Sequence, residues 1–410
     1  MKAIIFAAGK GKRLWPITEP YPKPFVKILG KPLIGWIIES LKRNKVNEII
    51  VIVNPKHTLP LDYYDFTKKE IDHSKTISVS EFLEKVYDVK TVFQNEPKGT
   101  AHALWCAREY IDDDFILMNG DDVVHFEDME KIVSEKGFFV SFFEDRSHFG
   151  AVVHENGLLV DIKEKTLSGP GLISLNLAHV PKEFIEYANI EKLTPSQRGE
   201  YEIADAFVNF AKDNEFKTIE IKPCYTISFY WDLIKVSLSF IERFVSGKYP
   251  LEWLGNDYQI KGDSIVHENA VVKTNELKGS FVGPGVTIET FSKVSQSVIE
   301  GFNRIGTSEI KGSVMMKKSN IPHFNYVGDS VLCEDVNLGA GTKLANLRFD
   351  NQNIFVETHK GKVNSKKHKL GSCIGAHTKF GVNSSVNCGL LIAPNSQILP
   401  NTFVKRNMGD

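Results

Sequence analysis

The stretch KAIIFAAGKGKRLWPITEPYPKPFVKILGKPL, residues 2–33, decides how the rest of the chain is interpreted. Its apolar residues 4–6 are typical of a strand that is buried on both faces of a sheet. A sharp turn with small and cationic residues follows at residues 7–13. Small residues let the backbone approach a ligand, and backbone N–H groups beside cations bind phosphate. We therefore predict a phosphate-chain site, with Lys23 held between two prolines as a further cation.

The glycine spacing of this turn differs from two common phosphate-binding motifs. It lacks the six-residue spacing of a dinucleotide fold, and no Lys–Ser/Thr pair follows Gly11 as in a P-loop. The pattern A-A-G-x-G-x-R-L-x-P-x-T with a later P-K-P instead resembles the signature of sugar-1-phosphate nucleotidylyltransferases. An ordinary glycine turn is the alternative. The resemblance implies catalytic roles for Arg13 and Lys23 and nucleotide binding by Ala7, Ala8, Gly9, Lys10 and Gly11.

The composition is that of an ordinary globular protein. A chain of 410 residues is too long for one compact core, so we expect two or three domains. The net charge of −1 gives no sign of a nucleic-acid or membrane partner. The five cysteines lack C-x-x-C spacing, which disfavours a disulfide framework or a thiolate zinc site. With no signal peptide or membrane span visible, we expect a cytoplasmic location.

The first half of the chain alternates strand and helix patterns. Residues 33–44 have helical spacing, and residues 49–53 form the next buried strand, which predicts a parallel sheet with crossover helices. Ligands of such sheets lie outside the carboxyl ends of the strands. We predict an α/β, Rossmann-like nucleotidyltransferase domain with a mostly parallel sheet over residues 1–245. An amphipathic helix at residues 231–244 ends it, and a linker follows at residues 246–262.

Two later strand ends carry candidate ligand groups. Gln94 offers a carbonyl and an amide together, which match the imide edge of uracil or thymine. A plain strand–loop–helix connection is the alternative, but residues 94–103 resemble the base-binding segment of uridylyl- and thymidylyltransferases. That resemblance implies UTP or dTTP, with Gly99 and Thr100 against the base. Asp121 follows a buried strand, and resemblance to the family's G-D motif makes it the expected Mg²⁺ ligand; the alternative is that the acidic pair, or Asp122 alone, caps a helix.

The resemblance also implies a site for a sugar 1-phosphate, formed by Gly150, Glu164 and Glu200, without fixing which sugar. Thr226 stands where relatives usually have a second metal-binding acid or Asn. A hydroxyl is a poor substitute, because Mg²⁺ needs anionic ligands to offset its dehydration. Either Asp121 and the phosphates suffice, or the nucleotidyl site is weak or inactive.

A period of six residues dominates the chain from residue 263 to residue 410. Such a period with interspersed glycines predicts a left-handed parallel β-helix of hexapeptide repeats. The apolar positions at six-residue steps are Ile374, Phe380, Val386, Ile392, Ile398 and Val404, with shorter runs at Val282, Ile288 and Val294 and at Leu332, Leu338 and Leu344.

Within this region, residues 321–330 (IPHFNYVGDS) and 336–342 (VNLGAGT) resemble the acetyltransferase half of bifunctional N-acetylglucosamine-1-phosphate uridylyltransferases, most closely the archaeal type. N-acetylation removes a proton from an ammonium group, and a histidine titrates in the right range to accept it. His323 is therefore the expected base. The resemblance implies acetyl-CoA as co-substrate and a homotrimer or dimer of trimers. It also implies substrate contacts from Lys311, Tyr326, Asn337 and Asn346.

A lysine-rich loop at residues 348–370 interrupts the period and either holds phosphates of coenzyme A or the sugar, or is simply solvated. We predict a bifunctional enzyme that makes a nucleotide sugar and N-acetylates an amino-sugar 1-phosphate. One alternative is a nucleotidyltransferase whose β-helix only trimerises. The other is a catalytically weak regulatory paralogue that lacks the second metal ligand.

Overall fold

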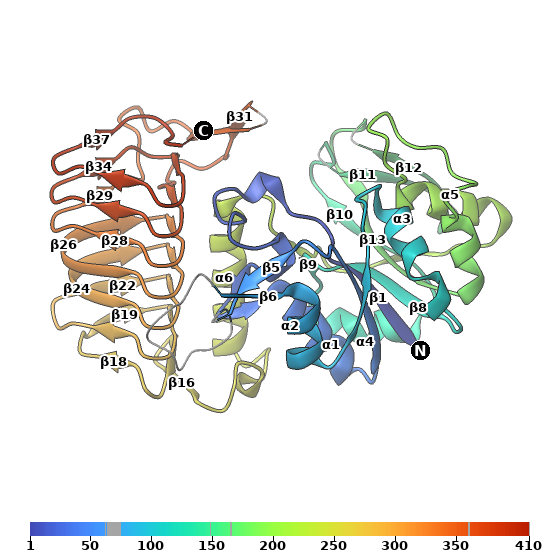
Figure 1. The fold of residues 1–410 in the computed structure, drawn as a ribbon, viewed down its shortest axis with the longest axis horizontal. Helices are drawn as coiled ribbons and strands as arrows, with labels where there is room; N and C mark the ends of the chain where they lie inside the picture. The colour runs from blue at the N-terminus through green and yellow to red at the C-terminus, as the bar shows by residue number, and fades with distance from the viewer. Residues whose placement is uncertain (62, 64–74, 148, 165, 360, 410) are drawn as a thin grey trace.

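The computed structural model describes residues 1–61, 63, 75–147, 149–164, 166–359 and 361–409. It shows an α/β domain beside a prism of short stacked strands, with helix α6 (Tyr230–Val245) between them (Figure 1). This helix is the one predicted at residues 231–244. No helix in the described part of the chain is long and apolar enough to span a membrane.

A nine-stranded sheet forms the centre of the first domain. Strand β1 lies in the middle and pairs in parallel with both β4 and β8, as predicted. The other half of the sheet is mainly antiparallel, because β13 runs against β8, β10 and β11, while β10 and β14 pair in parallel. The strands are β1 (Lys2–Phe6), β4 (Glu48–Val53), β7 (Lys90–Phe93), β8 (Phe115–Asn119), β10 (Gly137–Phe143), β11 (Gly150–Glu155), β12 (Leu158–Glu164), β13 (Gly171–Val180) and β14 (Thr218–Glu220).

Both faces of this sheet are covered. Ile4 and Ile5 are adjacent in β1 but belong to different hydrophobic cores, as expected of a strand buried on both sides. Residues of α3 and α5 share the core of Ile4, and residues of α1, α2, α4 and α6 share that of Ile5. The remaining helices are α1 (Leu33–Arg43), α2 (Val79–Tyr87), α3 (Thr100–Cys106), α4 (Phe126–Ser134) and α5 (Ile203–Asp213).

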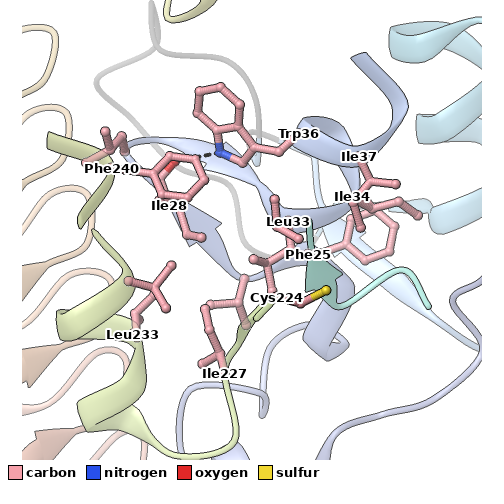
Figure 2. Close-up of a cluster of buried hydrophobic side chains, with 14 of the residues drawn as sticks. Phe25, Ile28, Leu33, Ile34, Trp36, Ile37, Cys224, Ile227, Leu233 and Phe240 are labelled. Atoms are coloured by element: carbon pink, nitrogen blue, oxygen red, sulfur yellow. Dashed lines mark hydrogen bonds between the residues drawn. The ribbon is translucent and has the colours of Figure 1, made fainter. Parts of the chain in front are cut away.

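The segment that follows the glycine turn is packed deeply between α1 and α6. Phe25 and Ile28 lie there among residues of both helices (Figure 2). The Trp36 indole Nε1 donates to the Ile28 carbonyl at 3.1 Å, which ties α1 to this segment. Burial on this scale holds the backbone rigid. The chain is therefore held in place by α1 and α6 at the residues that directly follow Lys23.

The second domain is a parallel β-helix. Two-residue strands stack on successive coils, so that Val298 lies opposite Val314 and Val314 opposite Val331. All the apolar residues predicted from the six-residue period are buried in one core. The handedness of the coil remains a prediction from the resemblance. The first face contains β17 (Ser264–His267), β20 (Phe281–Val282), β23 (Val298–Ile299), β25 (Val314–Met315), β27 (Val331–Leu332), β32 (Cys373–Ile374) and β35 (Leu391–Ile392).

The second and third faces meet at an edge where the long strands β24 and β26 bend from one face to the other. The second face contains β18 (Val271–Val272), β21 (Thr287–Ile288), β28 (Asn337–Leu338), β33 (Lys379–Phe380) and β36 (Gln397–Ile398), and the third contains β19 (Glu276–Lys278), β22 (Lys293–Ser295), β29 (Lys343–Leu344), β34 (Ser385–Val386) and β37 (Phe403–Val404), with β24 (Arg304–Lys311) and β26 (Asn320–Gly328) shared.

A ladder of buried serines lines another edge of the prism. The backbone N–H of Ser297 donates to the Ser280 hydroxyl at 3.2 Å, and Ser313 donates to Ser297 in the same way. Ser330 and Ser372 continue the ladder at 3.1 Å. Each serine hydroxyl thus accepts a hydrogen bond from a backbone N–H group at the edge, outside the ladders of the strands. The six-residue period did not reveal this ladder, because serine is common in ordinary turns.

The first face of the β-helix packs on the first domain. The outward residues of its strands, such as Phe281, Val298 and Val331, belong to the same core as α1 and α6. The Tyr230 hydroxyl also donates to the Gly371 carbonyl at 2.8 Å. Strand β16 (Tyr258–Lys261) pairs with β17 although it falls inside the predicted linker. The linker at residues 246–262, and with it the domain boundary, stays a prediction.

Charged residues are buried in this domain interface. Lys27 Nζ lies 3.8 Å from Glu334 Oε1, and both side chains are almost fully buried. Glu300 is only 1% exposed, and neither of its carboxylate oxygens has a hydrogen-bond partner among the described residues. Burial raises the pKa of Glu300 to about 7, with Lys27 opposing the rise and Glu334 adding to it. The interface therefore contains a carboxyl group that titrates near neutral pH.

The lysine-rich insertion forms a hairpin. Strands β30 (Phe355–Thr358) and β31 (Gly361–Asn364) pair antiparallel, and β31 projects from one end of the β-helix toward the first domain (Figure 1). Of the lysines predicted to form a basic loop, Lys360 lies outside the described residues.

Candidate functional site

The glycine turn after β1 presents a row of backbone donors. The Ala7 N–H donates to the Ile52 carbonyl at 2.8 Å, so it continues the sheet and is not open to a ligand. The next four amides, at residues 8–11, donate to no described residue. Gly9 faces open space, since an added Cβ would meet nothing within 4 Å. The turn therefore forms an anion cradle from residue 8 onward, and Ala7 is its base.

Lys23 is held directly against this turn. Its backbone N–H donates to the Lys10 carbonyl at 3.2 Å. Gly11 has a φ of +77°, and a Cβ there would lie 2.4 Å from the Lys23 Cβ, so both the conformation and the space require glycine. Lys23 Nζ pairs with Asp121 Oδ2 at 2.7 Å. Burial favours a lower pKa for Lys23, but Asp121 and Asp122 outweigh it and raise the pKa. Lys23 is therefore a fixed cation.

Asp121 reaches this position because two strand ends converge. The Gly120 N–H donates to the Phe6 carbonyl at 2.8 Å, and a Cβ on Gly120 would lie 2.8 Å from the same oxygen. Only glycine allows β8 and β1 to approach this closely. The carboxylate that follows, Asp121, is consequently brought beside the cradle.

Asp122 does not cap a helix, which was the alternative interpretation of this residue. It lies in β9 (Asp122–Val123), opposite Thr226 of β15 (Tyr225–Thr226), and His125 stands at the start of α4 instead. Asn119 Nδ2 donates to Asp122 Oδ2 at 3.0 Å, while Oδ1 is buried without a hydrogen-bond partner among the described residues. Burial and the charge of Asp121 raise the pKa of Asp122. An orphaned carboxylate oxygen next to a second carboxylate is a donor set that fits Mg²⁺.

Two of the predicted base-binding residues, Gln94 and Gly99, contact each other. Gln94 Nε2 donates to the Gly99 carbonyl at 2.9 Å and lies 3.1 Å from His102 Nδ1. The Gln94 amide nitrogen therefore shapes the loop, and its carbonyl oxygen has no partner among the described residues. Gly99 touches the backbone of Tyr201, where a Cβ would lie 2.4 Å from the carbonyl oxygen. The Thr100 hydroxyl accepts from the Ile203 N–H at 2.9 Å and thus positions the start of α5.

The predicted sugar-binding residues lie on strands that meet. Gly150 is opposite Glu164, and a Cβ at Gly150 would lie 2.7 Å from Glu164 Oε1, so the carboxylate folds over the glycine. Burial, together with Glu200 and Glu164, raises the pKa of Glu202. The three glutamates therefore share one region. Glu202 was quoted in the sequence motif but not selected, because its burial arises only when α5 packs on the sheet.

In the β-helix, three of the predicted residues meet at the edge between the third and first faces. Lys311 is opposite Gly328, and a Cβ on Gly328 would lie 2.6 Å from Asn346 Nδ2 and 2.7 Å from the Tyr326 hydroxyl. Asn346 Nδ2 also donates to Asp329 Oδ2 at 2.5 Å. Burial raises the pKa of Tyr326, with Asn346 opposing the rise. Asp329 belongs to this group although it was not selected from the sequence.

The other two predicted residues lie elsewhere. His323 is exposed on β26, next to the bend at Phe324, which is 68% exposed. Asn337 lies on the second face, where its Oδ1 accepts from Asn320 Nδ2 at 3.0 Å. Neither His323 nor Asn337 contacts Tyr326 or Asn346 through a side-chain hydrogen bond within the described parts of the chain. A single chain therefore spreads the predicted acetyltransferase residues over the outside of the prism.

Comparison with known proteins covers both domains. The family described as "Nucleotidyl transferase" matches residues 2–231. The "Bifunctional sugar-1-phosphate nucleotidylyltransferase/acetyltransferase" of Sulfurisphaera tokodaii is 32% identical over 434 residues, which cover 100% of this chain and 98% of that protein. The "Bifunctional protein GlmU" is 32% identical in Methanococcus maripaludis and 31% identical in Methanocaldococcus jannaschii, covering 100% of this chain and 95% and 96% of those proteins. The similarity therefore extends from the glycine turn through the β-helix.

Proposed function

This chain belongs to the nucleotidyl transferase family, and from that premise we propose that it is a bifunctional enzyme of nucleotide-sugar synthesis. Its first domain joins a sugar 1-phosphate to UTP or dTTP. Its second domain transfers an acetyl group from acetyl-CoA to an amino-sugar 1-phosphate. The observation that carries the first activity is the row of open amides at residues 8–11 beside the buried Lys23–Asp121 ion pair.

In the first reaction, a phosphate oxygen of the sugar 1-phosphate attacks the α-phosphorus of the nucleotide. The bond to the bridging oxygen of the β-phosphate breaks, and pyrophosphate leaves. Negative charge builds up on the leaving group, and the amides of the turn, Arg13 and Lys23 are placed to offset it. Because these groups are fixed before substrate arrives, the reaction needs positioning and electrostatics rather than a covalent intermediate.

A magnesium ion would be held by Asp121, with Asp122 beside it. Bound Mg²⁺ supplies charge neutralisation and orientation of the phosphate oxygens. Thr226 supplies no negative charge for Mg²⁺. Asp122 lies opposite Thr226 in the pair of strands β9 and β15, and its carboxylate adds a second anion there. The Thr226 position is therefore compatible with an active site. Gln94 and Gly99 would recognise the pyrimidine, and Gly150, Glu164 and Glu200 the sugar.

In the second reaction, the amine of the sugar attacks the thioester carbonyl of acetyl-CoA. A C–N bond forms, the C–S bond breaks, and coenzyme A leaves as a thiol. We assign the proton of the attacking ammonium group to His323, which is exposed on β26 and accessible to substrate. Lys311, Tyr326, Asn337 and Asn346 would contact the substrates.

The second site would be completed by further copies of the chain in a homotrimer or dimer of trimers. Large apolar side chains are exposed along the edge between the second and third faces, next to His323. They form an apolar ridge of Phe291, Phe324, Val382 and Leu399. Exposed apolar groups in a row are typical of an interaction surface.

All five cysteines are free thiols, which agrees with a reducing, cytoplasmic setting.

The test is an assay that follows the two products separately. Purified protein receives Mg²⁺, UTP or dTTP, and glucosamine or galactosamine 1-phosphate, with and without acetyl-CoA. We expect pyrophosphate and free thiol, and we expect Lys23→Gln to lower pyrophosphate release about 10²–10³-fold without changing thiol release. Pyrophosphate without thiol would favour a β-helix that only trimerises. The absence of both products would favour a regulatory paralogue and contradict the proposal.

A further inference from the structure

A cavity lies between the glycine turn of the first domain and the hairpin of the second. Its volume is about 420 Å³, within the range of about 300–1,000 Å³ that is typical of small-molecule sites. One wall belongs to the turn and the segment that follows it, and the opposite wall to β30 and the end of the chain. The lining includes the charged residues and the histidine Lys10, Lys12, Arg13, Glu19, Glu357 and His359.

The hairpin wall is fixed in place by the β-helix. Val356 of β30 and the preceding Ile354 are both fully buried. Asn407 bridges the hairpin to the last coils, because its Nδ2 donates to the Glu357 carbonyl and its Oδ1 accepts from the Leu391 N–H, each at 2.9 Å. The Thr358 hydroxyl donates to the Gly361 carbonyl at 2.9 Å and shapes the tip. The hairpin is therefore a supported wall of the cavity.

The hairpin also reaches the first domain beyond the cavity. Lys366 Nζ lies 3.6 Å from Asp145 Oδ2, in the loop that follows β10. This contact is exposed and contributes little stability by itself. It shows, however, that the insertion extends from the glycine turn toward the lobe that carries Gly150 and Glu164.

The charges of the lining favour an anionic ligand. Lys10, Lys12 and Arg13 are exposed and form no ion pair with any described residue. Of the residues with open amides, 8–11, Lys10 lines the cavity, and the others lie on the same turn. The carboxylates of Glu19 and Glu357 oppose these cations and repel a highly charged anion. We therefore expect the ligand to bind as its magnesium complex, which carries less negative charge than the free anion. His359 adds a donor from the hairpin, since an imidazole keeps at least one N–H in either protonation state.

We propose that His359, on the hairpin of the β-helix domain, binds the pyrophosphate that nucleotidyl transfer releases beside the cations of the glycine turn. The proposal rests on the proposed function of the first domain. His359 is thus assigned as a residue that binds the leaving group. It belongs to the second domain, whereas the other binding residues belong to the first. The second domain would thereby complete the first site from within the same chain.

The test is calorimetric titration of the full-length protein with inorganic pyrophosphate in the presence of MgCl₂. We expect His359→Ala to weaken pyrophosphate binding about tenfold, the effect of losing one hydrogen bond to a charged group. His359→Lys should restore most of the affinity, because an ammonium group also donates to phosphate. His368→Ala is the matched control, since His368 belongs to the same insertion but does not line the cavity.

A second measurement separates this inference from the proposed function. In the product assay, we expect His359→Ala to change the KM for nucleotide and product inhibition by pyrophosphate more than kcat, and to leave thiol release unchanged. Equal pyrophosphate affinity in wild type and His359→Ala would overturn the inference, as would a wild-type protein that binds no pyrophosphate. Binding that depends on His359 without any pyrophosphate release would uphold the inference and instead contradict the nucleotidyl-transfer proposal.

Discussion

The two proposed reaction sites differ in how completely one chain builds them. In the first domain, residues from separate elements contact one another, as in the Lys23–Asp121 ion pair and the approach of the Glu164 carboxylate to Gly150. In the β-helix, Tyr326 and Asn346 meet at one edge while His323 is exposed near another. A doubly wound sheet gathers its strand ends at one place, whereas a β-helix repeats its contacts along an axis. We therefore expect the first site to be enclosed by its own fold, and we propose that the second is completed by another copy of the chain.

The largest expected effect is that of His323→Ala. Removing the proposed base should lower thiol release about 10²–10⁴-fold, the usual contribution of general-base catalysis. Pyrophosphate release should stay within about twofold, because His323 lies on the β-helix, away from the glycine turn. His377→Ala, another histidine of the β-helix, serves as the control. If thiol release survived in His323→Ala, the histidine would not be the base and the proposed second site would be wrong.

A smaller effect is expected from Phe324→Glu, which places a charge in the apolar ridge. If the second site forms between copies, this variant should shift the mass measured by light scattering from oligomer to monomer. Thiol release should fall about tenfold or more as the interface is lost, while pyrophosphate release persists. Val86→Glu makes the same charge change at an exposed apolar position of α2. A monomeric Phe324→Glu protein with full thiol release would show that one chain suffices and would remove the contrast between the sites.

The smallest effect on catalysis is expected at Glu300, in the interface that joins the two domains, where a substitution changes stability instead. Its pKa is raised from 4.5 to about 7 by burial, so its contribution to stability is full below pH 4.5 and is lost as the pH rises to about 7. Glu300→Gln should remove this dependence. Relative to wild type, the variant should gain on the order of 3 kcal/mol in free energy of unfolding between pH 4.5 and pH 8.

Denaturant unfolding at pH 4.5 and pH 8 measures this difference. The exposed Glu268→Gln provides the control, since a solvated carboxylate has no burial penalty to lose. An identical pH dependence in wild type and Glu300→Gln would mean that Glu300 is ionised in the folded protein throughout this range. The charges of Lys27 and of Lys317, which also opposes the rise in the pKa of Glu300, would then dominate the interface.

The sequence by itself determined the family and both fold types. The glycine turn, the strand ends at Gln94 and Asp121, and the six-residue period are local patterns, because each depends only on residue type and spacing. The resemblance to bifunctional nucleotidylyltransferase/acetyltransferases was confirmed by relatives that match over the whole chain. The inward residues of the β-helix were also predicted, since each coil repeats the same requirement for one apolar residue per strand.

Only the tertiary structure decided which groups face one another across long distances in sequence. The pairing of Asp122 with Thr226, the burial of Glu300 against the first domain, and the hairpin wall near the glycine turn all arise where separate elements pack. No periodicity marks such contacts, because burial and charge pairing depend on how two surfaces meet rather than on the spacing within either one. The sequence therefore identified the chemistry of each segment, and packing determined which segments work together.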